Sequence, residues 1–305
     1  MNAEPMLAGI ELGGSKVVIL GAIGRVIVER ETIPTTTPAE TLANAVTILE
    51  RWHADTPFAA IGIGSFGPLR LDRHAPDFGV MLPTPKSGWA GTDIFGTLTA
   101  PFNCPAAIDT DVNGAALAEL RWGAGVQDNM QSDSLCYITI GTGVGGGFAF
   151  NGRVVHGAMH PEIGHIRLPR APGDDFAGNC PFHGDCIEGL VSGPALARRF
   201  GVPGHEIDDA DPRWDHVVSD ISHLVSTVLL GTSARQILIG GGIGLGRPEL
   251  LGRVREKSVV QLGGYLPHIN GDSIRRIVAA PLLGDQAGAL GTVALAMDAL
   301  GMGIN

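Results

Sequence analysis

The sequence lacks any run of eighteen apolar residues, and its first residues lack the basic and then apolar pattern that is typical of a secretory signal. Neither a membrane span nor export is indicated, so we expect a cytoplasmic protein. Basic residues are also few: 21 lysines and arginines stand against 31 aspartates and glutamates, a formal net charge of −10. Because nucleic-acid surfaces need clustered positive charge, and no basic cluster occurs, the expected partner is a small molecule and not nucleic acid.

Cysteine is scarce as well, with four residues in the chain. Four cysteines in a protein expected in the cytoplasm are poor candidates for disulfides. Cys104 and Cys136 lie among apolar residues, which indicates a role in the core. Cys180 and Cys186 instead lie among residue types that bind metals.

Two parts of the sequence resemble each other. Residues 9–14 and 137–142 are both apolar runs that end in a glycine-rich turn, and each is followed at the same interval by a second turn glycine, Gly24 or Gly152. Each copy predicts a β-hairpin or meander. Further helices and strands are predicted from apolar spacing, the helices at residues 38–53, 112–122, 189–200, 214–230 and 287–300 and the strands at 59–64 and 236–239.

This order of strands, helix and strand, occurring twice, predicts two α/β lobes that face one cleft. With 305 residues, 44% of them hydrophobic, the chain is long enough for two lobes. We expect the smaller lobe at residues 1–118 with 289–305, the final helix packing back on it, and the larger lobe at residues 119–288.

Three glycine-rich loops follow apolar strands. In the first, residues 13–16, glycine lets backbone amides approach an anion and Lys16 adds positive charge, although a simple hairpin turn explains the motif equally well. The second has five glycines within residues 141–147 and favours a phosphate cradle. It is neither a Walker loop nor a dinucleotide fingerprint, because the lysine and hydroxyl pair is missing and a strand follows. The third loop, residues 240–244, could lie flat against an adenine or a ribose.

The segment from residue 160 to residue 188 contains a group of metal-ligand residue types. Two cysteines and a histidine at intervals of three, with a fourth donor upstream, are suited to one tetrahedral structural zinc ion. The expected ligands are His165, Cys180, His183 and Cys186. The alternatives are unpaired polar residues in a loop, or a separate zinc finger, which a loop inside an enzyme-sized chain does not favour.

Asp111 lies where a strand is expected to pass into a helix. An aspartate at such a junction commonly caps the helix, and capping is the first interpretation.

The three loops together resemble the actin, hexokinase and Hsp70 superfamily, in which two ribonuclease-H-like lobes close on ATP. Several motifs also resemble the ROK (repressor, open reading frame, kinase) family: DTDVN at residues 109–113, HPEIGH at 160–165 and CPFHGDCIE at 180–188. The form with His183 in the middle of the last motif is typical of the fructokinase branch. Further motifs follow in the order seen in bacterial fructokinases: SFGP at 65–68, TPK at 84–86, SGPA at 192–195 and GDQAG at 284–288.

The resemblance implies that Asp111 accepts the proton of a sugar hydroxyl as this hydroxyl attacks the γ-phosphoryl group of Mg·ATP. The expected hydroxyl is the 6-hydroxyl of D-fructose. Magnesium would come with ATP, zinc would be structural, and the family habit implies a homodimer. The residues expected to bind ATP are Gly13, Gly14, Ser15, Lys16, Thr142, Gly143, Pro194, Gly240, Gly241, Gly242, Ile243 and Gly244. Those expected to bind the sugar are Gly67, Pro68, Thr110, Asp111, Glu162, His165 and Glu188.

Two departures from the wider ROK pattern point away from glucose: Glu11 replaces an aspartate of the first phosphate loop, and Thr110 replaces the asparagine before the base in glucokinases. A broader hexose kinase acting on mannose or glucose stays an alternative, because pocket geometry decides the hydroxyl orientation that is accepted. A ROK repressor is the other alternative. It is not expected here, because a repressor carries a helix-turn-helix domain ahead of the first loop, which begins about a dozen residues from Met1.

Overall fold

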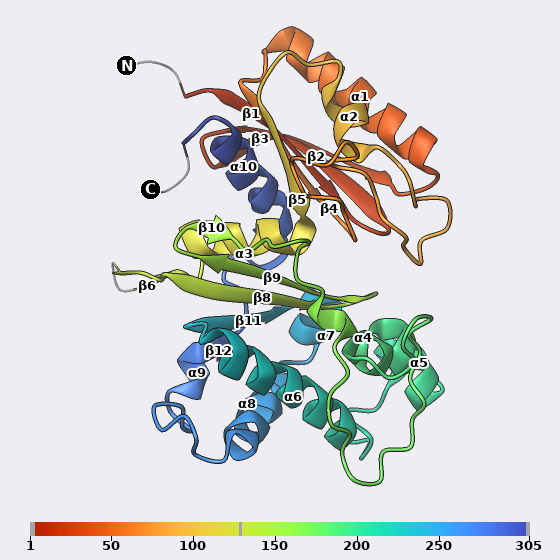
Figure 1. Cartoon of the computed structure of the whole chain (residues 1–305), viewed down its shortest axis with the longest axis vertical. Coiled ribbons are helices and arrows are strands. Elements are labelled where there is room, and N and C mark those ends of the chain that lie inside the picture. The colour runs from red at the N-terminus through yellow and green to blue at the C-terminus, as the bar shows by residue number, and fades with distance from the viewer. Residues whose placement is uncertain (1–3, 128–129, 303–305) are drawn as a thin grey trace. The chain divides into compact units, whose positions relative to one another are not determined.

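The computed structural model describes residues 4–127 and 130–302, and contacts between Cα atoms divide the chain into two compact units (Figure 1). Unit 1 contains Met1–Gln131, Gly147–Pro161 and Asp285–Asn305, and unit 2 contains Ser132–Gly146 and Glu162–Gly284. The expected lobes, residues 1–118 with 289–305 and residues 119–288, stay a prediction about the domains. The α/β class is confirmed, since each unit combines a sheet with helices.

Unit 1 is built on a sheet with the strand order β3-β2-β1-β4-β5. The strands are β1 (Met6–Leu12), β2 (Lys16–Ile23), β3 (Val26–Pro34), β4 (Ala60–Ser65) and β5 (Ala106–Thr110). The first three form an antiparallel meander, and β4 and β5 continue the sheet parallel to β1. Parallel strands bring their C-terminal ends to one edge, and at such an edge α/β proteins commonly bind ligands. The segments that follow β1, β4 and β5 carry candidate site residues.

The helices of unit 1 are α1 (Pro38–Asp55), α2 (Ile94–Thr99), α3 (Asp111–Trp122) and α10 (Ala287–Ala299). Helices α1 and α2 cover one face of the sheet and α10 covers the other (Figure 1). The first face packs Ile10 and Ile19 of the strands against Leu49 of α1, and the second packs Leu7 and Leu20 against Val293 of α10. The sheet therefore has two apolar faces, as the nearly continuous burial of β1, β2 and β4 requires.

Helix α1 shows how local sequence sets an element. It begins after Thr37, whose side chain accepts a hydrogen bond from the Glu40 backbone N–H, and proline occupies its first turn. Its buried residues recur at helical spacing on one face: Thr41, Leu42, Ala45, Ile48, Leu49 and Trp52. The predicted helix over residues 38–53 is confirmed and continues to Asp55.

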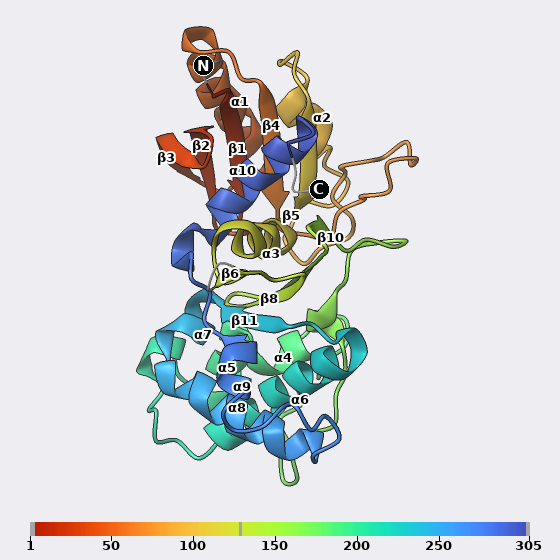
Figure 2. The same cartoon turned by 90° about the vertical axis from the view of Figure 1, so that its left-hand side faces the viewer.

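Helix α10 lies unusually close to its neighbours, β4, β1 and α3 (Figure 2). A Cβ atom added to Gly62 of β4 would lie 1.9 Å from the Thr292 carbonyl oxygen of α10. Likewise, a Cβ atom on Gly291 would lie 2.3 Å from the Gly114 carbonyl carbon of α3. Glycine at these positions lets backbone approach backbone without an intervening side chain.

A second sheet has the order β10-β9-β8-β11-β12, which reproduces the arrangement of the first. Its strands are β8 (Ser134–Ile140), β9 (Val144–Phe150), β10 (Arg153–Val154), β11 (Gln236–Gly240) and β12 (Val278–Ala279). Strand β11 pairs in parallel with β8, as β4 does with β1. The internal repeat predicted from residues 9–14 and 137–142 is thereby confirmed.

The remaining elements lie mainly in unit 2. They are α4 (Ile187–Val191), α5 (Gly193–Phe200), α6 (Trp214–Thr232), α7 (Gly241–Gly246), α8 (Pro248–Leu262) and α9 (Ile274–Ile277), the 3₁₀ turns η1 (Ile163–His165), η2 (Gly204–Glu206) and η3 (Gly284–Gln286), and the short strands β6 (Val126–Gln127) and β7 (Met130–Gln131). The helix predicted over residues 189–200 is two helices, because Ser192 ends α4 and caps α5. None of the helices in the described part of the chain has the length and apolarity needed to cross a membrane.

The close packing of α10 predicts that Gly62→Ala destabilises the protein. The added methyl would overlap a backbone carbonyl, and such overpacking costs about 1–3 kcal/mol. The free energy of unfolding, measured in urea, should fall by this amount. Gly252→Ala in α8 is the matched control, because no atom lies within 4 Å of the added Cβ and alanine favours a helix. An unchanged stability of Gly62→Ala would contradict the packing described here.

Candidate functional site

The turn between β1 and β2 carries the first expected ATP-binding segment, residues 13–16. Its ends are joined by a hydrogen bond from Gly13 N–H to the Lys16 carbonyl, 3.0 Å between N and O. Gly14, Ser15 and Lys16 are exposed. The Lys86 ammonium donates to the Gly14 carbonyl at 2.6 Å, so a second positive charge lies at this turn. Lys86 entered the sequence analysis only as part of a family motif.

Asp111 is the first residue of α3, directly after β5. The capping role that its position allowed belongs to Thr110, whose hydroxyl accepts from the Asn113 backbone N–H at 3.2 Å. One oxygen of Asp111 accepts from the Val112 backbone N–H at 2.9 Å. Burial raises the pKa of the Asp111 carboxyl to about 6. Such a group is mostly ionised at neutral pH and still basic enough to accept a proton.

Glu11, near the end of β1, is a second carboxyl group with a raised pKa. Burial, and after it the neighbouring Asp111, raises the pKa of Glu11 to about 7, while Lys16 and Arg30 act in the opposite direction. Gly288 makes room for this side chain, because a Cβ atom there would lie 2.1 Å from Glu11 Oε1. Asp111 therefore lies close enough to Glu11 in unit 1 for its charge to raise the pKa of the Glu11 carboxyl.

The turn after β4 contains Gly67 and Pro68, both half-buried. Buried His160 anchors its far side: the Leu69 backbone N–H donates to His160 Nε2 at 3.0 Å. Because Nε2 accepts this hydrogen bond, His160 is neutral in this contact, and burial lowers its pKa accordingly. Sequence reasoning gave His160 no role, since this contact spans 91 residues of chain.

Asp109 is a further group that sequence reasoning missed. This buried aspartate accepts hydrogen bonds from the Thr110 backbone N–H and from the Asn113 side-chain amide, both at 2.7 Å, and its second oxygen lies 2.9 Å from His156 Nε2. The bond to Asp109 raises the pKa of His156, whereas burial and Arg73 lower it. The alternation of acidic residues in DTDVN was visible, but the partner on a distant segment was not.

In unit 2, the turn between β8 and β9 carries Thr142, which is exposed, and Gly143. Gly141 N–H donates to the Gly143 carbonyl at 2.9 Å, and Val144 N–H donates to Glu188 Oε2 at 3.1 Å. A Cβ atom on Gly143 would lie 2.7 Å from that same carboxylate oxygen. The turn and Glu188, assigned to ATP and sugar respectively, are therefore neighbours.

The phosphate cradle predicted over residues 141–147 is wrong in its extent. The turn is limited to residues 141–143, and the last three glycines lie within β9. Gly146 and Gly147 are needed for packing: added Cβ atoms would lie 2.2 Å from Ile163 Cδ1 and 2.0 Å from the Val112 carbonyl oxygen. The many glycines at residues 141–147 therefore have two causes: a turn, and the close approach of neighbouring chain segments.

The other expected nucleotide-binding segments lie beside this turn. Gly193 N–H donates to the Gly141 carbonyl at 2.7 Å, next to exposed Pro194. A Cβ atom on Gly193 would lie 4.0 Å from Ile243 Cδ1, and one on Gly141 would lie 3.9 Å from Gly242 N. The predicted loop over residues 240–244 is in fact the end of β11 and the first turns of α7. Gly241 starts this helix at a φ of +82°, a conformation that favours glycine.

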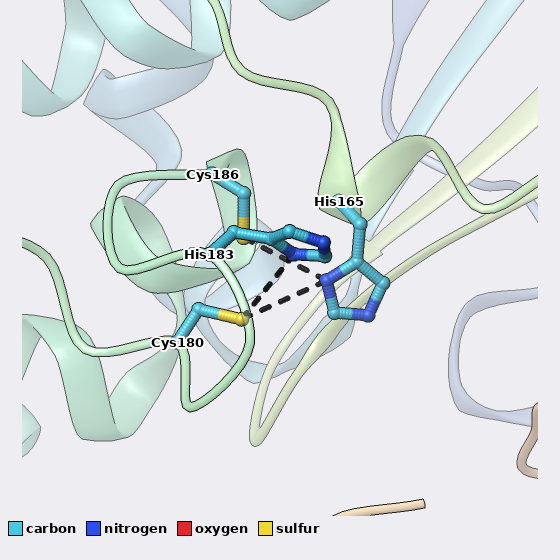
Figure 3. A group of neighbouring side chains, drawn as sticks. All are labelled: His165, Cys180, His183 and Cys186. Atoms are coloured by element: carbon cyan, nitrogen blue, oxygen red, sulfur yellow. Dashed lines mark hydrogen bonds between the residues drawn. The ribbon is translucent and has the colours of Figure 1, made fainter. Parts of the chain in front are cut away.

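The four predicted metal ligands come together in unit 2 (Figure 3). One ligand atom from each of His165, Cys180, His183 and Cys186 lies within 4.8 Å of the others. The sulfur of Cys180 is 3.8 Å from His165 Nδ1 and 3.7 Å from His183 Nδ1, and the sulfur of Cys186 is 3.6 Å from His165 Nδ1.

These distances fit a tetrahedral zinc site. Zn–S bonds of about 2.3 Å and Zn–N bonds of about 2.0–2.1 Å at the tetrahedral angle separate sulfur and nitrogen by about 3.6 Å. Cys180 is held in a tight turn by paired backbone hydrogen bonds with Gly184, and Cys186 immediately precedes α4, which carries Glu188. A metal ion here would fix the start of α4.

A buried ion network holds the chain between the first and second ligand. The Arg199 guanidinium bonds to Asp174 and, at 3.1 Å, to Asp220, and all three side chains are at most 3% exposed. Arg170 adds a bond to Asp174 at 2.7 Å and one to the Phe176 carbonyl at 2.9 Å. These bonds tie an irregular segment to α5 and α6, which carry Arg199 and Asp220.

Similarity to known proteins extends over nearly the whole chain. The model of the ROK family matches residues 7–299. A fructokinase from Zymomonas mobilis is 39% identical over 305 residues, with 98% of each chain covered. A fructokinase from Pediococcus pentosaceus is 38% identical over 298 residues, which cover 97% of this chain and 99% of that protein. Among solved structures, the ROK hexokinase from Thermus thermophilus has a TM-score of 0.75 at 25% identity, covering 97% of this chain and 99% of that one.

The four-residue cluster predicts that Cys180→Ser loses bound zinc and stability together. A hydroxyl is a poor zinc ligand, and the metal-binding energy contributes to folding, so Tm should fall by about 5 °C or more. Elemental analysis and thermal unfolding measure the two effects. Cys104→Ala is the control, because Cys104 packs against the core of unit 1 and should leave the zinc content unchanged. Full zinc content in Cys180→Ser would exclude this ligand set.

Proposed function

The chain belongs to the ROK family and is a sugar kinase, and from that premise we propose that it is an ATP-dependent fructokinase. The reaction transfers the γ-phosphoryl group of Mg·ATP to the 6-hydroxyl of D-fructose and gives fructose 6-phosphate and ADP. Two relatives at 38–39% identity, matched over almost their full lengths, are fructokinases, which supports fructose as the substrate.

The observation that carries the mechanism is Asp111, a half-buried carboxylate at the start of α3 that is not used as the helix cap. Asp111 accepts the proton of the 6-hydroxyl, the sugar oxygen forms a bond to the γ-phosphorus, and the bond from that phosphorus to the bridging oxygen breaks to release ADP. A base with a pKa of about 6 is ionised before the reaction and suits this proton transfer. Magnesium in the substrate complex neutralises phosphate charge.

Turns suited to phosphate binding occur in both units. Unit 1 supplies the turn at residues 13–16 with two lysines for phosphate binding, and unit 2 supplies the turn at residues 141–143 with the starts of α5 and α7. Main-chain amides and positive charge at turns are suited to phosphate oxygens. The residues assigned to the sugar are Gly67, Pro68, Thr110, Asp111, Glu162, His165 and Glu188.

Zinc has a structural role in this proposal. The Cys186 ligand precedes α4 by one residue, and the His165 ligand follows Glu162 by three, so one ion fixes both segments that carry sugar-binding carboxylates. His165 turns Nδ1 toward both sulfur atoms and its other ring nitrogen away from them (Figure 3), which leaves Nε2 for the sugar. A homodimer, suggested by family habit, is a further part of the proposal.

A broader hexose kinase is the second candidate, because the Thermus thermophilus relative is a hexokinase. A coupled ADP-release assay with Mg·ATP against fructose, mannose, glucose, N-acetylglucosamine and N-acetylmannosamine decides between them. We expect fructose to give the highest kcat/KM. A higher value for another hexose would remove the named substrate but keep the mechanism, and no turnover with any of the five would overturn the kinase assignment.

We expect Asp111→Asn to lower kcat by about 100- to 10,000-fold, the range for a general base, with little change in the KM for the sugar. The substitution removes the proton acceptor and keeps the side-chain shape. Asp55→Asn, at an exposed aspartate at the end of α1, is the control and should retain full turnover. Near-normal turnover in Asp111→Asn would show that another group is the base.

A further inference from the structure

Asp109 accepts hydrogen bonds from residues on both sides of the proposed base, Asp111. Asp109 is 2% exposed, and its Oδ1 atom accepts from the Thr110 backbone N–H and from Asn113 Nδ2. Thr110 directly precedes Asp111, and Asn113 follows it by two positions. The buried carboxylate therefore joins the Thr110 backbone to the Asn113 side chain across the first turn of α3.

Asn113 extends these hydrogen bonds to β9, a strand of the second sheet whose last residues belong to unit 1. Its Oδ1 atom accepts from the Phe148 backbone N–H of β9 at 3.2 Å, and its own backbone N–H donates to the Thr110 hydroxyl. Asn113 is fully buried, and its side chain is satisfied on both the donor and the acceptor side. An amide held in this way fixes the start of α3, and with it the direction of the Asp111 side chain.

The second oxygen of Asp109 depends on His156. His156 Nε2 lies 2.9 Å from Asp109 Oδ2, and the His156 side chain is 35% exposed whereas that of Asp109 is 3% exposed. A carboxylate accepts hydrogen bonds only, so Nε2 must carry the hydrogen in this contact. Without this donor, one oxygen of a buried charge would lose its partner, a costly state that is relieved by rotation or protonation of the carboxyl group.

We propose that His156 is a positioning residue for phosphoryl transfer, which acts through Asp109 on Thr110 and Asn113 and thereby orients Asp111. The inference rests on the proposed function of Asp111. His156 itself touches no reacting atom in this role. Its removal should slow the chemical step and leave the binding of ATP and sugar nearly unchanged.

The test compares two amides in place of the imidazole. In His156→Gln the amide nitrogen stands near the position of Nε2 and can still donate to Asp109, whereas in His156→Asn it stands near the position of Nδ1 and cannot reach. With Mg·ATP and the preferred hexose, we expect His156→Asn to lower kcat by about 10- to 100-fold, the range for residues that orient a functional group. His156→Gln should retain most of the activity, with KM values close to those of the unchanged protein in both variants.

A double-mutant cycle with Asp111→Asn then separates positioning from general stability. If His156 acts through Asp111, His156→Asn should cause no further loss of kcat in the Asp111→Asn protein. His74→Asn, at an exposed histidine of the same unit, is the control for the substitution. Thermal unfolding of each variant shows whether lost activity reflects lost folded protein.

Several results would overturn the inference while Asp111 keeps its role: full kcat in His156→Asn, equal losses in the asparagine and glutamine variants, or an independent loss that multiplies with that of Asp111→Asn. Near-normal turnover of Asp111→Asn alone would instead overturn the proposed base, and with it the role of His156. The two failures are therefore distinguishable.

Discussion

Contact of backbone with backbone between α10 and its neighbours sets the geometry of unit 1. Gly62 in β4 and the paired glycines of α3 and α10, Gly114 and Gly291, remove the side chains that would hold these elements apart. The same helix receives the Glu11 carboxylate over Gly288. Asp111 begins α3, so the position of the proposed base relative to β1 and β4 follows from how closely α3 and α10 approach. Because backbone packs directly against backbone here, these elements have little room to shift relative to one another.

Unit 2 reaches a defined site by different means. The segment from Glu162 to Cys186 has little regular secondary structure. Arg199 joins its middle to the helices through two buried carboxylates, and the cluster of two histidines and two cysteines, the proposed zinc site, joins its ends. Charge pairing and metal coordination are directional, so they can order an irregular chain that an apolar core would leave unspecified.

The sequence predicted the features that depend on local patterns. Apolar spacing located α1 and α6, the turn glycines located the repeated meanders, and the ligand types between residues 165 and 186 located the cluster. Contacts between distant segments were not predictable in this way. His156 with Asp109, His160 with Leu69 and the ion network of Arg199 join residues that no short motif relates, and the glycines of β9 were assigned to a loop because their neighbours in space, Ile163 and Val112, are invisible in a linear pattern.

Helix α10 is the last element of unit 1 along the chain, and this order has a consequence for biosynthesis. Residues 1–131 leave the ribosome before unit 2, yet the face of their sheet that contains Leu7 and Leu20 lacks its main covering helix until residues 287–299 have been made. All residues of unit 2 precede that point, since the unit ends at Gly284. Unit 2 can therefore complete its fold before unit 1, whose last helix has not yet been made. This reverses the usual order, in which the N-terminal part folds first during translation. During that interval the nascent chain exposes an apolar strand surface, the kind of surface that chaperones bind.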